Sequence, residues 1–205
     1  MKLYEDGYEQ CSCFWGTKPA ELVKEAVKLL KGRTPTGKLK AIDLGCGEGK
    51  NSNYISENGI NVIGIDQSDL AIHHANQLWK NSSALFITGD MQSVDGAENS
   101  FDLAVSTGSI HCLESEEQVL SMITKIKRLL RLDGIFVFSS FNDRKQDLSG
   151  HPTGFNPILL GHEFFLSCFD HFEIIYHSDK DLIDAHPHNN IPHIHSITRI
   201  LARRK

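Results

Sequence analysis

The chain has 205 residues, 40% of them hydrophobic, and its 26 acidic and 21 basic side chains give a formal net charge of −5. A chain of this length can fill one α/β core, so we expect a single domain over residues 1–205. The negative charge argues against a nucleic-acid partner and against binding to an anionic membrane surface.

Two further features bear on the cellular compartment. The chain does not open with a secretion-type apolar segment, and it holds no apolar run long enough to cross a bilayer. Its five cysteines form an odd set without the dense, even spacing of a disulfide scaffold. We therefore expect a cytoplasmic protein with reduced thiols, and the sequence leaves open whether it is a monomer or a homodimer.

Apolar, β-branched segments alternate with helical patterns from residue 39 onward, which is typical of βαβ units. Seven strands are predicted, over residues 39–44, 61–65, 84–88, 101–106, 135–140, 172–176 and 194–202. Because no helical pattern separates the last two strands, we expect them to form an antiparallel hairpin. The predicted fold class is α/β, with a doubly wound, mostly parallel seven-stranded sheet and helices on both faces.

Capping residues mark two of the predicted helices. Pro19 suits a first helical turn, and the apolar face that follows it ends at Gly32. We therefore expect residues 1–36 to form an N-terminal cap segment and helix. Ser68 is placed to cap the helix that follows the second strand.

Another helix and a long loop are predicted in the second half of the chain. Ser115 and Gln118 have the spacing of a capping box, and the helical pattern that follows is predicted to end at Gly134. Residues 142–161 contain Gly and Pro and few apolar repeats. They are the best candidate for a lid or loop over a site.

The most informative motif is I-D-L-G-C-G-E-G-K-N at residues 42–51, where the first strand runs into a glycine turn and then a helix. Its three glycines let a ligand lie against bare backbone N–H groups near a helix N-terminus. A dinucleotide fingerprint has a small residue where this chain has Lys50. That difference weakens an NAD(P) interpretation.

Two later strand ends carry carboxylates. Asp66 ends the second strand, where it can accept hydrogen bonds from both hydroxyls of a ribose. Asp90 and Met91 follow the third strand, where a carboxylate and a backbone amide can bind the amino edge of adenine. Because the carboxyl ends of parallel strands meet at one edge of the sheet, these residues predict an adenosine pocket.

The motifs I-D-L-G-C-G-E-G, V-I-G-I-D, G-D-M and F-D-L-A-V-S resemble, in their order and spacing, those of the class I S-adenosylmethionine-dependent methyltransferases. The resemblance implies a Rossmann-like fold, S-adenosylmethionine as cofactor, and methyl transfer as the activity. It also implies cofactor-binding roles at the strand ends: Gly45, Cys46 and Gly47 at the methionine part, Asp66 at the ribose, Gln67 over the adenine ring, Asp90 and Met91 at the adenine edge, Ser106 and Thr107 at the sulfonium end, and Asp43 behind the glycine turn or bound to the ammonium through water.

Within that superfamily, F-W-G-T-K-P near the N-terminus and the closing R-I-L-A-R-R-K are similar to the tellurite-resistance and thiol-methyltransferase-like group. This resemblance implies that Trp15 closes over the cofactor, although packing under the first helix explains a tryptophan there equally well. It implies a small-molecule acceptor: a thiol, a chalcogen oxyanion or a small hydroxyl compound. A soft acceptor such as a thiolate or a reduced chalcogen anion needs no general base, whereas an alcohol acceptor would need one nearby.

His111 is the candidate catalytic residue. It follows the fourth strand, in a loop where acceptors often bind in this fold, and it could contact the acceptor. The alternative is a structural histidine that is hydrogen-bonded to the backbone.

A run of histidines precedes the last strand. His186 and His188, and likewise His193 and His195, have the i, i+2 spacing of metal ligands on one face of a strand. No cysteine or carboxylate accompanies them at ligand spacing. We therefore expect a polar hairpin that lines the acceptor mouth or faces solvent, and no metal site.

Two other functions stay open. An NAD(P)-dependent oxidoreductase would need a Tyr or Lys acid near the fourth strand, and residues 106–113 offer neither. A non-catalytic ligand or metal sensor would instead use the C-terminal histidines.

Overall fold

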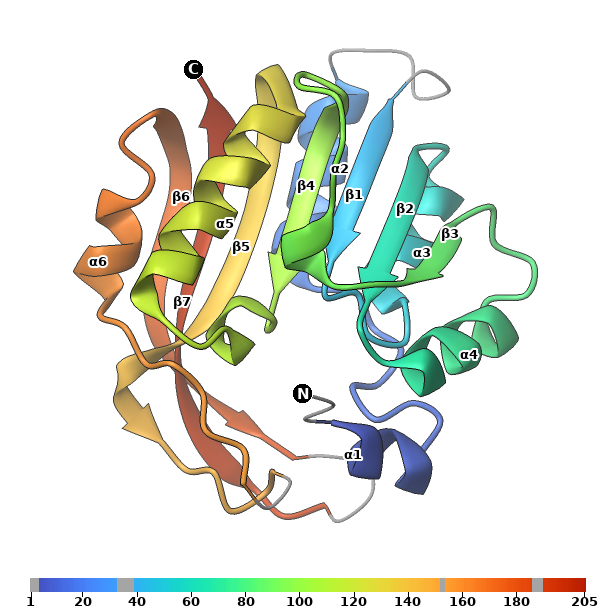
Figure 1. The fold of residues 1–205 in the computed structure, drawn as a ribbon, viewed down its shortest axis with the longest axis vertical. Helices are drawn as coiled ribbons and strands as arrows, with labels where there is room; N and C mark the ends of the chain where they lie inside the picture. Colours follow the sequence, from blue (N-terminus) through green and yellow to red (C-terminus); the bar gives the residue numbers. More distant parts are fainter. Residues whose placement is uncertain (1–3, 33–38, 152–153, 186–189) are drawn as a thin grey trace.

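The structure is a computed structural model, and it describes residues 4–32, 39–151, 154–185 and 190–205. Its centre is a seven-stranded sheet with the strand order β3-β2-β1-β4-β5-β7-β6 (Figure 1). The strands are β1 Lys40–Leu44, β2 Asn61–Asp66, β3 Leu85–Thr88, β4 Phe101–Thr107, β5 Leu130–Gln146, β6 Phe172–Asp184 and β7 His193–Arg204. The first five strands pair in parallel, and β7 runs antiparallel to β5 and β6. This confirms the predicted fold class, including the antiparallel C-terminal hairpin.

The helices are α1 Glu5–Gln10, α2 Glu21–Lys31, α3 Lys50–Glu57, α4 Asp69–Leu78, α5 Glu116–Leu129 and α6 His162–Ser167, with the short 3₁₀ helices η2 Met91–Ser93 and η3 Ile110–Cys112. Within the described residues, none of the helices has the length and apolar character needed to span a membrane.

Two hydrophobic cores lie on opposite faces of the sheet, because alternate residues of each central strand point to opposite sides. In β5, Phe136 and Phe138 belong to the core that α5 and α6 cover, whereas Ile135 and Val137 belong to the core that α2 and α3 cover. All four side chains are at most 1% exposed. Burial on both faces is the reason that the central strands are continuous apolar runs in the sequence.

The two predicted serine caps are confirmed, whereas Pro19 precedes Ala20, the N-cap residue of α2, and is not in the first helical turn. Ser68 Oγ accepts a hydrogen bond from the amide of Ala71 at 3.0 Å, at the start of α4. Ser115 Oγ accepts one from the amide of Gln118 at 3.3 Å, at the start of α5. The Gln118 side-chain oxygen in turn accepts from the amide of Glu114, the residue before the cap.

The helix predicted after Ser115 ends earlier than expected. α5 stops at Leu129, not at Gly134, and Leu130 already pairs with Phe101 of β4. A register shift follows, and Asp133 adopts a φ of 63° within it. Leu130 is fully buried as a strand residue. An apolar residue at this position fits a buried helix face as well as a buried strand. The sequence pattern therefore did not show that the strand begins at Leu130.

The segment predicted as a lid, residues 142–161, is only partly a loop. Residues 142–146 continue β5, and Gln146 pairs with His195 of β7. Asn142 donates a 2.7 Å hydrogen bond to Asp179 of β6, which ties this extension to the edge of the sheet. The short helices α1 and α6 were not predicted, because six residues give too little periodicity to recognise a helix.

Candidate functional site

The glycine turn joins β1 to α3 at the carboxyl edge of the sheet, and α1 lies beyond this edge (Figure 1). The amides of Gly45 and Cys46 both donate to the carbonyl of Ile65 in β2, at 2.8 and 3.0 Å. Gly45 has a φ of 71°, and a Cβ there would lie 2.3 Å from the Cβ of Ser109. Only glycine satisfies both the left-handed conformation and this close approach.

The cysteine in the turn is a packing residue. Cys46 is 8% exposed, and a Cβ added at Gly64 would lie 3.0 Å from its sulfur. Burial raises the pKa of the Cys46 thiol well above its ordinary value. The thiol therefore stays protonated and is not a nucleophile at neutral pH.

Asp66 is fixed by the turn that it faces. The amide of Gly47 donates to Asp66 Oδ2 at 2.8 Å, and the amide of Ser68 donates to Oδ1 at 3.0 Å. Burial nevertheless raises the pKa of this carboxyl above its ordinary value. Each carboxylate oxygen keeps a second lone pair, so the oriented group can still accept hydrogen bonds from a ligand.

Two more carboxylates are buried beside the turn. Asp43 is 1% exposed and accepts from Ser52 Oγ at 2.7 Å, and burial raises its pKa to about 7. Glu48 is 4% exposed and bonds to His74 Nδ1 at 3.0 Å, and burial raises its pKa too. Asp43 Oδ1 and Glu48 Oε2 have no hydrogen-bond partner among the described residues. With Asp66, these groups suit a ligand that carries positive charge.

A cavity of about 560 Å³ opens at this edge of the sheet. Most residues that the sequence predicted for cofactor binding or catalysis line it: Trp15, Gly45, Cys46, Gly47, Asp66, Gln67, Asp90, Met91, Thr107 and His111. The structure thus brings together strand ends that lie far apart in the sequence.

Asp43 and Ser106 are not among the residues that line the cavity. Ser106 is fully buried and donates to Ser109 Oγ at 2.8 Å, because the Ser109 hydroxyl is itself donated to the carbonyl of Leu44. Ser106 therefore orients the wall at Ser109 and does not face the cavity. Asp43 lies one layer behind the glycine turn.

The N-terminal segment closes one side of the cavity. The indole N–H of Trp15 donates to Tyr8 Oη at 3.0 Å, and Lys50 Nζ donates to the carbonyl of Trp15 at 2.7 Å. A Cβ at Gly47 would lie 3.2 Å from Tyr8 Oη and 3.5 Å from the Trp15 ring. Trp15 therefore lies against the glycine turn. Tyr8 was not singled out from the sequence, because nothing local links it to residue 47.

The third strand end differs from its predicted role in one respect. Asp90 is exposed, and its Oδ1 accepts from the amide of Gln92 at 2.8 Å to cap η2. Its carboxylate therefore stabilises its own turn. Met91 is half-buried against the core covered by α5 and α6, and it lines the cavity.

Thr107 is held at the end of β4 by Asn51, which the sequence analysis did not single out. Asn51 Nδ2 donates to Thr107 Oγ1 at 2.9 Å, and Asn51 Oδ1 accepts from the amide of Ala20 at 2.9 Å. One buried amide side chain thus joins the start of α3 to the start of α2 and the end of β4.

His111 lies in η3 and is 2% exposed. Its ring stacks on Phe141 with centroids 4.1 Å apart, and the amide of Phe141 donates to its Nδ1 at 3.3 Å. Burial lowers the pKa of His111 to about 3, and the nearby His195 adds to the shift. The ring is therefore neutral with its proton on Nε2, so at that atom it is a hydrogen-bond donor and not a base.

The far wall of the cavity comes from the C-terminal strands. Thr107 pairs with Ser139 of β5, and Ser139 pairs with Arg199 of β7, so the three side chains share one face of the sheet. All three line the cavity. Arg199 is half-buried, and it forms no ion pair within the described residues. The sequence analysis missed Arg199, since its place depends on strand register.

The histidine run differs from the expected polar hairpin. His186 and His188 lie outside the described residues. His193 and His195 are 2% and 1% exposed, so neither faces solvent, and neither lines the cavity.

The comparisons with known proteins agree with this geometry. A family model described as a methyltransferase domain matches residues 42–138. YqeM of Bacillus subtilis (strain 168), which carries the name of a methyltransferase, is 29% identical over 126 residues, or 54% of this chain and 51% of YqeM. The ubiquinone biosynthesis O-methyltransferase of Actinobacillus pleuropneumoniae serotype 7 (strain AP76) is 35% identical over 112 residues, or 50% of this chain and 46% of that protein. The chain thus spans about half the length of the curated relatives it matches.

A solved structure extends the likeness to nearly the whole fold. TehB from Haemophilus influenzae has a TM-score of 0.70 at 21% identity, with 89% of this chain and 62% of TehB covered. The methyltransferase match includes the glycine turn and the ends of β2, β3 and β4, which sets the nicotinamide alternative aside. The domain match over residues 42–138, the named relatives and the shared fold together support a class I S-adenosylmethionine-dependent methyltransferase, with S-adenosylmethionine as cofactor.

Proposed function

We propose that this chain transfers the methyl group of S-adenosylmethionine to a small-molecule acceptor, which is a thiol, a chalcogen oxyanion or a small hydroxyl compound. The observation that carries the proposal is one continuous cavity of about 560 Å³, which extends from the glycine turn and Asp66 to Ser139 and Arg199. Pockets for small organic ligands have volumes of roughly 300–1,000 Å³. A cofactor and a small acceptor can thus share this space.

The first part of the proposal concerns the cofactor. Asp66 accepts hydrogen bonds from the ribose hydroxyls of S-adenosylmethionine. The backbone at Gly47, which carries no side chain, lies along the methionine part of the cofactor. The buried carboxylates of Asp43 and Glu48 attract the positive charge of the cofactor, Asp43 from behind the turn. The second oxygen of each carboxylate, Asp43 Oδ1 and Glu48 Oε2, supports this assignment, since a buried carboxylate oxygen without a hydrogen bond is costly.

The second part concerns the reaction. Bound S-adenosylmethionine supplies a methyl group that its sulfonium already activates. The protein therefore has to position the acceptor in line with that group and exclude water. Thr107 borders the cavity between the glycine turn and the C-terminal strands, where donor and acceptor meet.

The third part concerns the acceptor. Arg199 is the half-buried cation on the far wall, and burial lowers its pKa, which shows that it gives up hydration there. Within the three acceptor classes it favours an anion, such as a thiolate or a chalcogen oxyanion. His111 Nε2–H is the neutral donor that we assign to the same acceptor. No general base is required for such a nucleophile.

Calorimetric titration with S-adenosylhomocysteine tests the cofactor part. We expect micromolar binding by the wild type and loss of binding by Asp66→Ala, with Asp66→Asn intermediate because its amide oxygen still accepts hydrogen bonds. The matched control is Asp95→Ala, which removes an exposed carboxylate outside the cavity. Equal affinity in Asp66→Ala and wild type would contradict the proposed site.

An acceptor screen tests the reaction itself. Formation of S-adenosylhomocysteine is measured with small thiols, with selenite and tellurite, and with small hydroxyl compounds. Turnover with at least one anionic acceptor, dependent on Asp66, supports the proposal. Tight cofactor binding without turnover on any of the three classes counts against the acceptor assignment and leaves the cofactor site intact.

The same proposal includes the setting of the reaction. We expect the protein to act in the cytoplasm, as a monomer or homodimer, without a nucleic-acid partner. The net charge of −5 supports the last point. Light scattering on the purified chain and titration with duplex DNA check the oligomeric state and the absence of DNA binding.

A further inference from the structure

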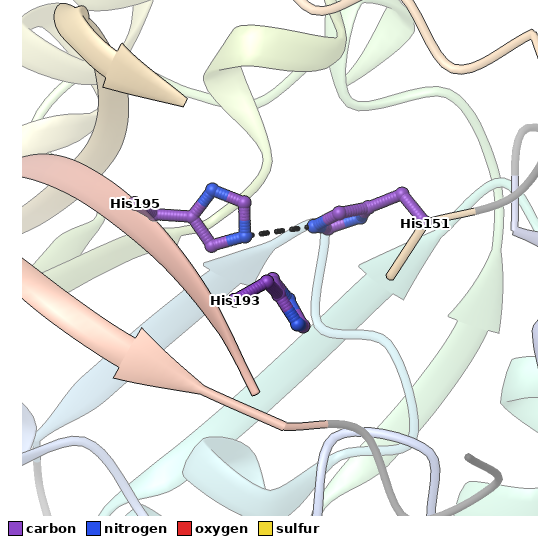
Figure 2. A group of neighbouring side chains, drawn as sticks. All are labelled: His151, His193 and His195. Carbon is purple, nitrogen blue, oxygen red and sulfur yellow. Dashed lines mark hydrogen bonds between the residues drawn. The ribbon is translucent and has the colours of Figure 1, made fainter. Parts of the chain in front are cut away.

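The side chains of three histidines, His151, His193 and His195, converge (Figure 2). His193 and His195 belong to β7, and His151 comes from the segment after β5. One ring nitrogen from each lies within 4.8 Å of the other two. His151 Nε2 and His195 Nε2 are 2.9 Å apart.

From this cluster we propose that the protein binds one divalent transition-metal ion, of the Zn²⁺ type, through His151, His193 and His195. Such a site lies outside the methyl-transfer machinery and does not depend on it. It also revises the expectation that the histidine run binds no metal.

The hydrogen bonds of His193 and His195 fix the atoms that face the cluster. His193 Nδ1 is 2.8 Å from the carbonyl of Ile191, which can only accept, so Nδ1 carries the proton. His195 Nδ1 is 2.8 Å from Gln146 Oε1. Each ring therefore carries its lone pair on Nε2, the atom that can act as a metal ligand.

The orientation of Gln146 is itself determined. Its Nε2 donates to the carbonyls of Asn142 and Ser196, both at 2.8 Å, so its oxygen must face His195. A carbonyl or carboxamide that holds the second ring nitrogen is the usual partner of a metal-binding histidine, because it sets the tautomer and the ring plane. Two of the three rings already have this support.

The spacing suits a tetrahedral ion. Two nitrogens bound at 2.0–2.1 Å in tetrahedral geometry lie about 3.3 Å apart. In the cluster, the Nε2 atoms of His151 and His195 are 2.9 Å apart, and all the ligand nitrogens lie within 4.8 Å of one another. These distances lie on either side of about 3.3 Å. Side-chain shifts of about 1 Å bring all three nitrogens onto one ion, with the His151 ring turned to present a lone pair in place of its hydrogen bond to His195.

The packing around the cluster keeps the rings close. Phe141 stacks on His195 with centroids 4.2 Å apart, and Phe155 stacks on His151 at 4.9 Å. A Cβ at Gly150 would lie 2.6 Å from the His193 ring, so the segment carrying His151 can approach β7 only with glycine there. Phe141 also lines the cavity, which places the metal one side chain behind the cavity wall.

The ligand set indicates the metal. Imidazole nitrogens favour Zn²⁺, Co²⁺, Ni²⁺ or Cu²⁺ over Mg²⁺ and Ca²⁺, which prefer oxygen. Three protein ligands leave a fourth position for water or another small ligand. The ion would join β7 to the segment after β5 and so fix the wall that carries Phe141.

Metal titration of the full chain tests the proposal. The purified protein is stripped with a chelator, dialysed, and titrated with Zn²⁺ by calorimetry and with Co²⁺ by visible absorption, whose intensity distinguishes tetrahedral from octahedral coordination. We expect one equivalent of metal per chain and a tetrahedral Co²⁺ spectrum. His193→Ala and His195→Ala should each weaken Zn²⁺ binding by at least about 100-fold, more than the 10–100-fold typical of a lost outer partner. Gln146→Leu should fall within that smaller range.

Two double variants are controls. His162→Ala/His177→Ala removes another pair of neighbouring histidines, whose Nε2 and Nδ1 atoms are 3.1 Å apart, and should leave the Zn²⁺ affinity unchanged. His186→Ala/His188→Ala removes the other half of the histidine run and should also leave it unchanged. If His195→Ala fails to fold, His195→Gln, judged by its circular dichroism, takes its place.

Several outcomes would overturn the proposal. These are no Zn²⁺ binding by the wild type, an octahedral Co²⁺ spectrum, unchanged affinity in the His193 and His195 variants, or loss of binding in either double variant. Calorimetry with S-adenosylhomocysteine on the same samples measures cofactor binding separately. Failure of the metal site can therefore be distinguished from failure of the cofactor site.

Discussion

The side chain of Ser109 occupies the space that a side chain at Gly45 would need: a Cβ on Gly45 would lie 2.3 Å from Ser109 Cβ and 2.9 Å from Ser109 Oγ. Ser109 donates to the carbonyl of Leu44, so the loop after β4 is bound directly to the end of β1. The two strand ends that bear the cofactor pocket thus support one another.

This contact predicts a large stability difference between two glycine substitutions. Gly45→Ala should lower the free energy of unfolding by about 1–3 kcal/mol more than Gly108→Ala, because overpacking adds to the backbone strain. Both glycines have a φ of 71°, but a Cβ at Gly108 would meet nothing within 4 Å. Urea unfolding of the two variants measures the difference. Equal destabilisation of the two variants would show that the loop at Ser109 can move away from a side chain at position 45 without cost.

The buried carboxyl of Asp43 predicts a pH dependence of stability. Its pKa of about 7 in the folded protein lies above the value of an unfolded aspartate, so the folded state binds the proton more tightly. Stability from this group is therefore greatest below about pH 4 and is lost as the pH rises toward 7. As the pH rises from 5 to 8, the free energy of unfolding of Asp43→Asn should therefore increase by about 2 kcal/mol relative to that of the wild type. Urea unfolding at both pH values tests this, and a constant difference would contradict it.

His111 should not titrate in the physiological range. With a pKa lowered to about 3 by burial and with Nδ1 accepting from the amide of Phe141, the ring should stay neutral, with its proton on Nε2, from pH 5 to pH 8. Nitrogen-15 NMR of the imidazoles measures the tautomer, and His111→Gln assigns the signal. A proton on Nδ1, or titration near pH 6, would restore a general-base role.

Arg199 should affect the acceptor and not the cofactor. Arg199→Gln is expected to raise the KM for an anionic acceptor about 10–100-fold, the effect of losing a charged hydrogen bond, and to leave the affinity for S-adenosylhomocysteine unchanged. Arg128→Gln, on the exposed face of α5, is the matched control. Steady-state kinetics and calorimetry on the same samples separate the two effects. A loss of S-adenosylhomocysteine affinity would place Arg199 at the cofactor instead.

The sequence by itself determined the central part of this protein. β1, β4 and the middle of β5 are continuous apolar runs because both of their faces are buried. The glycine turn follows β1 directly, and Asp66 ends β2. Such signals lie within a few residues of one another. They predicted the sheet, the family and most of the residues that line the cavity.

Only the tertiary structure decided what the C-terminal strands contribute. Arg199 reaches the cavity because β7 pairs with β5 in one particular register, and a slip of one residue would turn it to the other face. His151 and His195 are 44 residues apart in the sequence. They meet because β5 extends to Gln146 and pairs there with His195 of the antiparallel strand β7. Register and loop path depend on packing between distant segments, and for that reason no local pattern in the sequence revealed them.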